Sequence, residues 1–137
     1  MLTISKSARI SPHAEIGDST RGSKIRIDSF VKIVVRGGLG DVVIGKNSYV
    51  NSGNVIYSGN GVNIGENVLI AANCTIVPVN HEFRARDKKI SEQRFMPSKG
   101  GIIIEDCVIG ALSLVKGKLD EYGVYAGNPL LKIGERS

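Results

Sequence analysis

The sequence predicts an all-β fold, a parallel β-helix built from six-residue repeats. A branched aliphatic residue returns every six positions, first at Ile4, Ile10 and Ile16, and a small residue such as Ala8 or Cys74 follows such a position by four. Neither an α-helix nor an alternating strand keeps a period of six, whereas a chain that coils with three short strands per turn does. We therefore expect coils of about 18 residues around one internal aliphatic column.

The expected elements are short strands, each centred on one of these aliphatic residues. The repeat is interrupted at residues 22–24 and 37–40, and two extra residues, Val62 and Asn63, precede Ile64. The turns are rich in Gly, Asp and Asn, which tolerate left-handed backbone. After the last repeat, 127–129 (Gly-Asn-Pro) suits a short helical turn that would cover the open end of the coil. Between the interruptions and the end of the regular repeat, the expected column positions are Ile27, Ile33, Ile44, Val50, Ile56, Ile64, Ile70 and Ile76.

Length and composition agree with one such domain over residues 1–137. Aromatic residues make up only 5% of the chain, which suits a narrow prism filled by Ile and Val. The alternative is a β-sandwich of short strands, but so regular a period of six disfavours it. The chain has no apolar run of the roughly 20 residues that a membrane-spanning helix needs, and no apolar secretory stretch at its start. We therefore expect a cytoplasmic protein without a membrane span.

Charge and cysteine content narrow the range of partners. The formal net charge of +5 suits an anionic partner such as a phosphorylated cofactor. Nucleic acid is disfavoured, because Lys and Arg are dispersed and few aromatics accompany them. Cys74 and Cys107 stand in apolar segments, so we expect buried thiols rather than a disulfide, with a raised pKa that makes Cys74 a poor nucleophile. Two histidines and two scattered cysteines disfavour a metal site, because zinc needs three or four converging nitrogen or sulfur ligands.

A long polar segment interrupts the repeat after His81. It covers about residues 82–101, and the apolar pattern returns at Ile102. A loop of this length that leaves a repeat fold is typically functional, although a solvated excursion would have the same composition. Its basic residues are Arg84, Arg86, Lys88, Lys89, Arg94 and Lys99.

Four segments of the chain resemble a known family. Ile64–Ile76, Asn80–Phe83, Gly100–Asp106 and Tyr125–Pro129 are similar to sugar O-acetyltransferases of the hexapeptide-repeat acyltransferase family, in the branch of galactoside, maltose and surface-polysaccharide acetyltransferases. The resemblance is specific from about Ile44 to the C-terminus. It implies a left-handed β-helix, acetyl-CoA as the acyl donor, a sugar or saccharide as the acceptor, and a homotrimer with its sites between subunits.

The resemblance also implies roles for individual residues. His81 falls where the family keeps its catalytic base, and an imidazole can take the proton of a hydroxyl as it attacks. Asn51 falls where the galactoside enzymes contact the acceptor, although a turn residue would look the same. The two are 30 residues apart, or 28 without the insertion, so on one subunit they should face different directions. Gly110, Ala111 and Lys116 are expected to hold coenzyme A.

The sequence departs from the family in the second half of the chain. About one coil of the usual return from the loop is missing, together with a Trp. Ile104 and Ile109 are five residues apart instead of six, and Ser58-Gly59 stand where the galactoside enzymes have two aspartates. Two hypotheses follow. The protein is either an O-acetyltransferase that works by His-assisted direct attack, without a covalent enzyme intermediate, or a non-catalytic β-helix that serves as an assembly scaffold.

Overall fold

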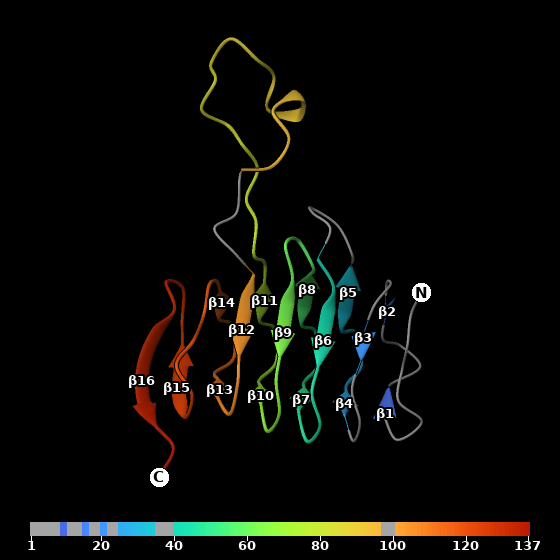
Figure 1. Ribbon diagram of the computed structural model, residues 1–137, viewed down its shortest axis with the longest axis vertical. Coiled ribbons are helices and arrows are strands. Elements are labelled where there is room, and N and C mark those ends of the chain that lie inside the picture. Colours follow the sequence, from blue (N-terminus) through green and yellow to red (C-terminus); the bar gives the residue numbers. More distant parts are fainter. Residues whose placement is uncertain (1–8, 11–14, 17–19, 22–24, 35–39, 97–100) are drawn as a thin grey trace.

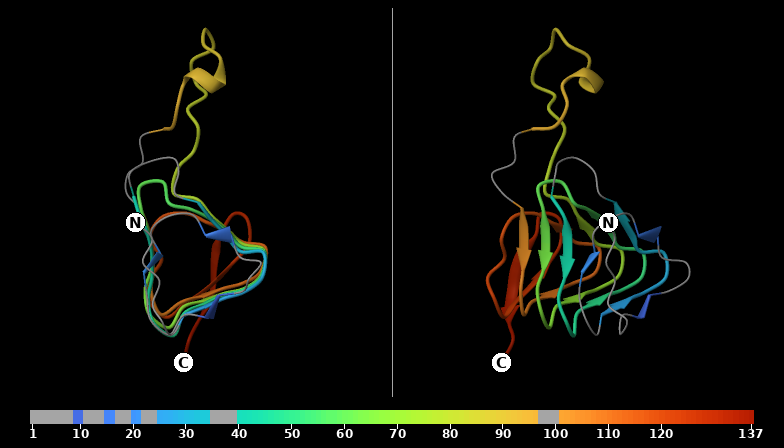
Figure 2. Two further views of the ribbon diagram at one scale, coloured as in Figure 1. Left: turned by 90° about the vertical axis from the view of Figure 1, so that its right-hand side faces the viewer. Right: turned by 45° about the vertical axis from the view of Figure 1, so that its right-hand side comes forward.

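The chain forms a left-handed parallel β-helix. The computed structural model describes residues 9–10, 15–16, 20–21, 25–34, 40–96 and 101–137. Their strands stack into a prism of triangular cross-section (Figures 1 and 2). Viewed from the end nearer β1, the coils turn counterclockwise as they recede, which is a left-handed path (Figure 2). The predicted fold is confirmed, and so is the hand, which the period alone had left open.

Three sheets form the walls of the prism, and from β1 to β14 successive strands of the chain fall on successive walls. Sheet A contains, in spatial order, β1 (Arg9–Ile10), β4 (Arg26–Ile27), β7 (Tyr49–Val50), β10 (Leu69–Ile70), β13 (Val108–Ile109), β15 (Gly123–Ala126) and β16 (Leu131–Glu135). Sheet B contains β2 (Glu15–Ile16), β5 (Lys32–Val34), β8 (Val55–Tyr57), β11 (Thr75–Ile76) and β14 (Leu114–Val115). Sheet C contains β3 (Thr20–Arg21), β6 (Val42–Ile44), β9 (Val62–Ile64) and β12 (Ile102–Ile104).

Equivalent positions of the repeat stack directly on one another. In sheet A, Ile70 lies opposite Val50 of the preceding coil and Ile109 of the following one. This register builds the aliphatic column, in which each side chain is at most 2% exposed. The column positions predicted at Ile4, Ile10 and Ile16 lie outside the residues whose side chains the structure describes. The predicted residues that it contains are Ile27, Ile33, Ile44, Val50, Ile56, Ile64, Ile70 and Ile76.

The residue two positions before each column residue also points inward, and where it is polar it ties neighbouring coils together. Ser48 donates a hydrogen bond from Oγ to the carbonyl of Gly65 over 2.7 Å, and the Oδ1 atom of Asn54 accepts one from the N–H of Cys74 over 2.7 Å. Cys74 and Cys107 are buried free thiols, and burial raises the pKa of both. A buried, protonated thiol is a poor nucleophile, as the sequence predicted for Cys74.

The shortened repeat between Ile104 and Ile109 does not disturb the column. Ile104 pairs with Ile64, Ile109 pairs with Ile70, and both are fully buried. The missing residue is absorbed by the turn at Asp106, whose backbone is left-handed with φ of 48°. Asn67 donates a hydrogen bond from Nδ2 to Oδ1 of Asp106 over 3.1 Å, so the two turns still stack. A turn of the prism can therefore change length without changing which residues are buried.

The end of the chain differs from the prediction. Gly127, Asn128 and Pro129 form a hairpin turn between β15 and β16, not the expected helical turn, and the peptide bond before Pro129 is cis. β16 runs antiparallel to β15 and extends sheet A. The alternation of Leu131 and Ile133 with polar residues lets this segment continue as a strand, and Gly127, with φ of 97°, supplies the reversal.

In the described part of the chain, no helix has the length and apolar character needed to span a membrane.

Candidate functional site

The long loop projects from the corner between sheets B and C (Figures 1 and 2). It leaves after β11 and returns through Gly101 into β12. Its base is a short antiparallel ribbon, in which the N–H of Met96 donates to the carbonyl of Asn80 over 2.8 Å and the N–H of Glu82 donates to that of Arg94 over 3.0 Å. The loop is therefore an ordered arm over its described residues 77–96. Residues 97–100, including Lys99, lie outside the described part.

One side chain organises the outer part of this arm. The side-chain carbonyl of Gln93 accepts a hydrogen bond from the N–H of Ala85 over 3.0 Å. Its amide donates to the carbonyls of Ala85, over 2.8 Å, and Lys88, over 3.0 Å. The arm also holds a short 3-10 turn at Ile90–Glu92. The Gln93 side chain thus takes part in three hydrogen bonds that fix the conformation of the tip. We call this arrangement the Gln93 clamp, and nothing in the sequence pattern predicted it.

His81 lies in the ribbon at the base of the arm. It forms an isolated antiparallel bridge with Phe95, and the two rings are 4.7 Å apart between centroids with a tilt of 32°. His81 is exposed, and no described residue makes a hydrogen bond with its imidazole. The ring contact limits the orientation of the imidazole, while its two nitrogens are left available to a substrate or to another chain.

The neighbouring carboxylate does not serve as a partner for His81. Glu82 accepts hydrogen bonds from Nε of Arg84 over 2.9 Å and from the N–H groups of Phe83 and Arg84 over 2.9 and 3.0 Å. The Arg84 side chain, together with these N–H groups, lowers the pKa of Glu82 to about 2. Glu82 is therefore an anion at neutral pH, and its charge is paired with Arg84 within the arm.

The residues predicted to bind substrates fall on two different edges of sheet B. Asn51 follows β7 at the corner between sheets A and B, and Gly110 lies two coils further along the same corner, after β13. At the corner between sheets B and C, Nζ of Lys116 lies 3.5 Å from Oδ1 of Asn80, next to His81. One chain therefore brings Lys116 to Asn80, the residue before His81, and leaves Asn51 at the other edge of sheet B.

Gly110 has a packing role that the sequence did not reveal. A Cβ atom at this position would lie 3.0 Å from the Cβ of Ala126 in the next coil. The carbonyl of Gly110 accepts hydrogen bonds from Ser113 Oγ over 2.6 Å and from the Cys74 thiol over 3.2 Å. Ala111, by contrast, is exposed at the corner. Of the pair, Ala111 is the one that can contact a ligand with its side chain.

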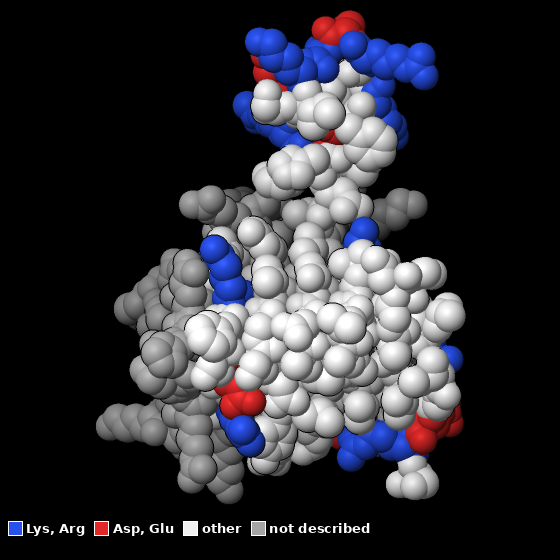
Figure 3. Space-filling view, turned by 180° about the vertical axis from the view of Figure 1, so that it is seen from behind, with Lys and Arg blue, Asp and Glu red and all other residues white. Residues whose placement is uncertain are grey.

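The outer face of sheet B joins the two edges and is largely uncharged. Figure 3 views the molecule from this side and shows a broad surface without acidic or basic side chains below the charged tip of the arm. Across β5, β8, β11 and β14 the outward residues form two rows, with a lysine at one end of each. These rows are Lys32, Val55, Thr75 and Leu114, and Val34, Tyr57, Val77 and Lys116.

The left-handed β-helix is a fold that this chain shares with solved structures of transferases. These structures include AntD, an N-acyltransferase from Bacillus cereus in complex with dTDP and 3-hydroxybutyryl-CoA. The match to AntD has a TM-score of 0.61 and 23% sequence identity, and it covers 98% of this chain and 79% of AntD. A hexapeptide transferase family protein from Anaplasma phagocytophilum has a TM-score of 0.62, 16% identity, and coverage of 98% and 79%. A maltose O-acetyltransferase from Clostridium difficile 630 has a TM-score of 0.59, 21% identity, and coverage of 86% and 70%.

These likenesses establish the fold. No family model matches the sequence, and no curated protein matches it in sequence. In the part of the chain that the structure describes, no group of three or more His, Cys, Asp or Glu side chains is placed to hold a metal ion.

Proposed function

We propose that this protein is an acyltransferase that moves an acetyl group from acetyl-CoA to a sugar hydroxyl. The observation that carries the proposal is His81, held by Phe95 at the base of an ordered arm that leaves the prism beside Lys116. Among the similar structures, an N-acyltransferase with an acyl-CoA bound supports the donor, and a maltose O-acetyltransferase supports a sugar hydroxyl as the acceptor. The direct test is release of free coenzyme A thiol from acetyl-CoA in the presence of a panel of sugars.

The proposed reaction is a direct transfer. The hydroxyl oxygen of the acceptor attacks the thioester carbonyl carbon while His81 takes the hydroxyl proton. The tetrahedral intermediate then collapses, the carbon–sulfur bond breaks, and the coenzyme A thiolate leaves and receives the proton from the imidazolium. No covalent enzyme intermediate is needed, and the buried thiol of Cys74, with its raised pKa, would be a poor nucleophile for one.

The proposed active unit is a homotrimer with sites between subunits. His81 gains no hydrogen bond from the described chain, and Asn51, the proposed acceptor contact, lies on the opposite edge of sheet B. A second copy packed against the uncharged face of sheet B would bring the Asn51 edge of one chain towards the His81 edge of the next. Because each copy offers one edge of each kind, such contacts can close a ring, and the resemblance implies that the ring has three members.

We expect sedimentation velocity to show a species of three times the 14.6 kDa chain mass at micromolar concentration. Thr75→Glu would place a charge in the middle of the uncharged face of sheet B and should shift the protein to monomers, because burying an unpaired carboxylate is unfavourable. Leu69→Glu is the matched control on sheet A and should remain trimeric. A wild-type chain that stays monomeric would contradict both the assembly and the shared site.

Binding of acetyl-CoA should be weak and sensitive to salt. The chain resembles longer enzymes but lacks about one coil, which would shorten a groove along the prism by about 4.8 Å. Exposed cations such as Arg86, Lys88 and Lys116 would then hold the phosphates mainly by charge, and salt screens exposed charges over about 8–10 Å. Calorimetry should show affinity falling several-fold from low to high salt, with Lys116→Gln weaker at low salt. Tight binding that does not change with salt concentration would contradict this prediction. The absence of binding at both salt concentrations would favour the scaffold hypothesis.

A further inference from the structure

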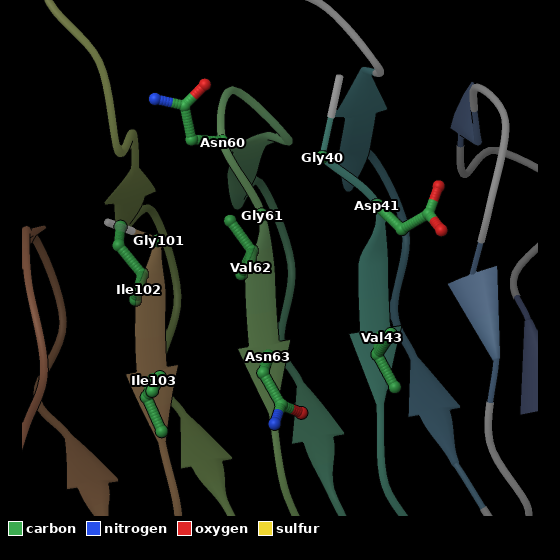
Figure 4. A pocket seen from close by; sticks show the side chains of 10 residues that line it. All are labelled: Gly40, Asp41, Val43, Asn60, Gly61, Val62, Asn63, Gly101, Ile102 and Ile103. Carbon is green, nitrogen blue, oxygen red and sulfur yellow. The ribbon is translucent and has the colours of Figure 1, made fainter. Parts of the chain in front are cut away.

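The outer face of sheet C carries a hollow over the backbone of two successive glycines, Gly61 and Gly101. The strands of this sheet are in register, so Asp41, Gly61 and Gly101 form one outward row, and Val43, Asn63 and Ile103 form the next. At Gly61 and Gly101 the backbone itself is the surface (Figure 4). The hollow has a volume of about 420 Å³, within the roughly 300–1,000 Å³ typical of small-molecule sites.

Close approach of the coils explains the bare floor of this hollow. A Cβ atom on Gly101 would lie 2.4 Å from the carbonyl oxygen of Gly61, and one on Gly40 would lie 1.9 Å from the nitrogen of Gly61. At Gly61 itself, where φ is 113°, a Cβ atom would meet nothing within 4 Å. The glycines therefore bring three coils together tightly and leave open space directly above Gly61, where the backbone is accessible to a ligand.

The walls of the hollow combine flat aliphatic surface with neutral hydrogen-bonding groups. Val43 and Ile103 are 37% and 38% exposed and flank Asn63, which is also exposed (Figure 4). The other polar side chains are Asn60, from the turn above, and Asp41 at the edge, whose carboxylate points away from Gly61 (Figure 4). Amides donate and accept hydrogen bonds, a carboxylate accepts them, and the aliphatic side chains offer an apolar contact. This combination matches a sugar ring, which has hydroxyls at its rim and C–H groups on its face.

The same walls disfavour a phosphorylated ligand. No Lys or Arg belongs to the described lining, whereas Asp41 contributes a negative charge. Lys118 pairs with Ile103 from the next coil, beyond the wall that Ile103 forms. Asp41 lies at the edge of the hollow with its carboxylate directed away from Gly61, and the described lining offers a phosphate no cationic partner (Figure 4).

The hollow lies next to the base of the arm. A Cβ atom on Gly59, two residues before Gly61, would lie 2.5 Å from Pro78 and 3.0 Å from Val79. These two residues begin the segment that carries His81, and Gly101, on the other side of the hollow, is where the arm returns to the prism. A molecule in the hollow would therefore sit at the foot of the arm, on the opposite side of the corner from sheet B.

We propose that this hollow is a saccharide subsite, which holds a neutral sugar ring of the acceptor beside the arm. The assignment rests on the proposed acetyl transfer for the identity of the acceptor, but binding in the hollow can be measured without turnover. It implies an acceptor with more than one sugar ring, one bound on sheet C and another presented to His81, and it disfavours a sugar nucleotide whose diphosphate would occupy the hollow.

The test is titration of the full-length, ¹⁵N-labelled protein with maltose and, separately, with dTDP. Maltose should shift the backbone amide resonances of Gly61, Asn63 and Ile103, while dTDP should leave them in place. Ile103→Trp should fill the hollow and weaken the maltose response at least about tenfold. Leu69→Trp, a control of matched exposure on sheet A (39% against 38%), should not.

Each outcome separates this inference from the proposed reaction. If maltose moves none of these resonances up to about 50 mM, where even millimolar sites fill, the subsite is wrong. It is equally wrong if dTDP moves them instead, or if Ile103→Trp keeps the wild-type KM for a disaccharide acceptor during normal turnover. If maltose binds in the hollow but no acetyl transfer occurs with any sugar, the reaction fails and the subsite stands.

Discussion

His81→Ala should lower the rate of acetyl transfer by about 10²–10⁴-fold, because removal of a general base typically costs this much. The side chain is exposed in the ribbon at the base of the arm and does not belong to the aliphatic column, so the melting temperature should not change. The measurement is kcat and KM from coenzyme A thiol release, with circular dichroism as the folding control. A variant that keeps more than about a third of the wild-type rate would show that His81 is not the base.

The ring contact between His81 and Phe95 offers a companion experiment. If the 4.7 Å contact positions the imidazole, Phe95→Ala should lower kcat by a smaller factor and leave the KM for acetyl-CoA unchanged. Phe95→Tyr keeps the ring and should restore most of the rate. Equal losses in the Ala and Tyr variants would mean that the ring does not position His81, because the aromatic contact survives in one of them.

The second large effect concerns stability. Ile70→Ala should lower the free energy of unfolding by roughly 2–5 kcal/mol, as truncation of a buried Ile leaves a cavity that its surroundings fill only in part. Ile70 is fully buried and stacks between Val50 and Ile109 of the adjacent coils, so a void there would interrupt the column in the middle of the prism. Chemical denaturation, followed by circular dichroism, measures the loss.

Leu69→Ala is the matched control for this experiment. Leu69 is adjacent in sequence and in the same strand, but it points outward and is 39% exposed, so its truncation should cost much less. Protein concentration must be equal in all samples, because dissociation of an oligomer contributes to its apparent stability. Similar losses in the two variants would contradict the single inward column.

Parts of the candidate site could be predicted because they depend on local sequence. The end of the regular repeat located the arm, and the resemblance singled out His81 at its start. The contact partner of His81 could not be predicted in the same way. Phe95 is 14 residues further along a polar segment, and the pairing depends on the ribbon that closes the arm. The hydrogen bonds of Gln93 could not be predicted either, because a glutamine in a polar loop belongs to no recognisable sequence pattern.

The sequence by itself determined the column and the fold class. Each repeat buries its own aliphatic residue, and this burial of apolar surface stabilises the folded state at every coil. The period of six in the sequence therefore corresponds directly to the strands of the coils. Even the shortened repeat at Ile104–Ile109 kept its buried residues, because the turn at Asp106 absorbed the change.

The tertiary structure alone decided what surrounds the column. Turn lengths vary between coils, so the wall on which a residue lies follows from the hydrogen bonds between coils and not from counting alone. Counting along the repeat already separated Asn51 from His81, but the contacts between coils made 127–129 a hairpin turn instead of a helical one and left the hollow above Gly61. Each of these features depends on which backbones lie side by side, and that is settled only when the coils stack.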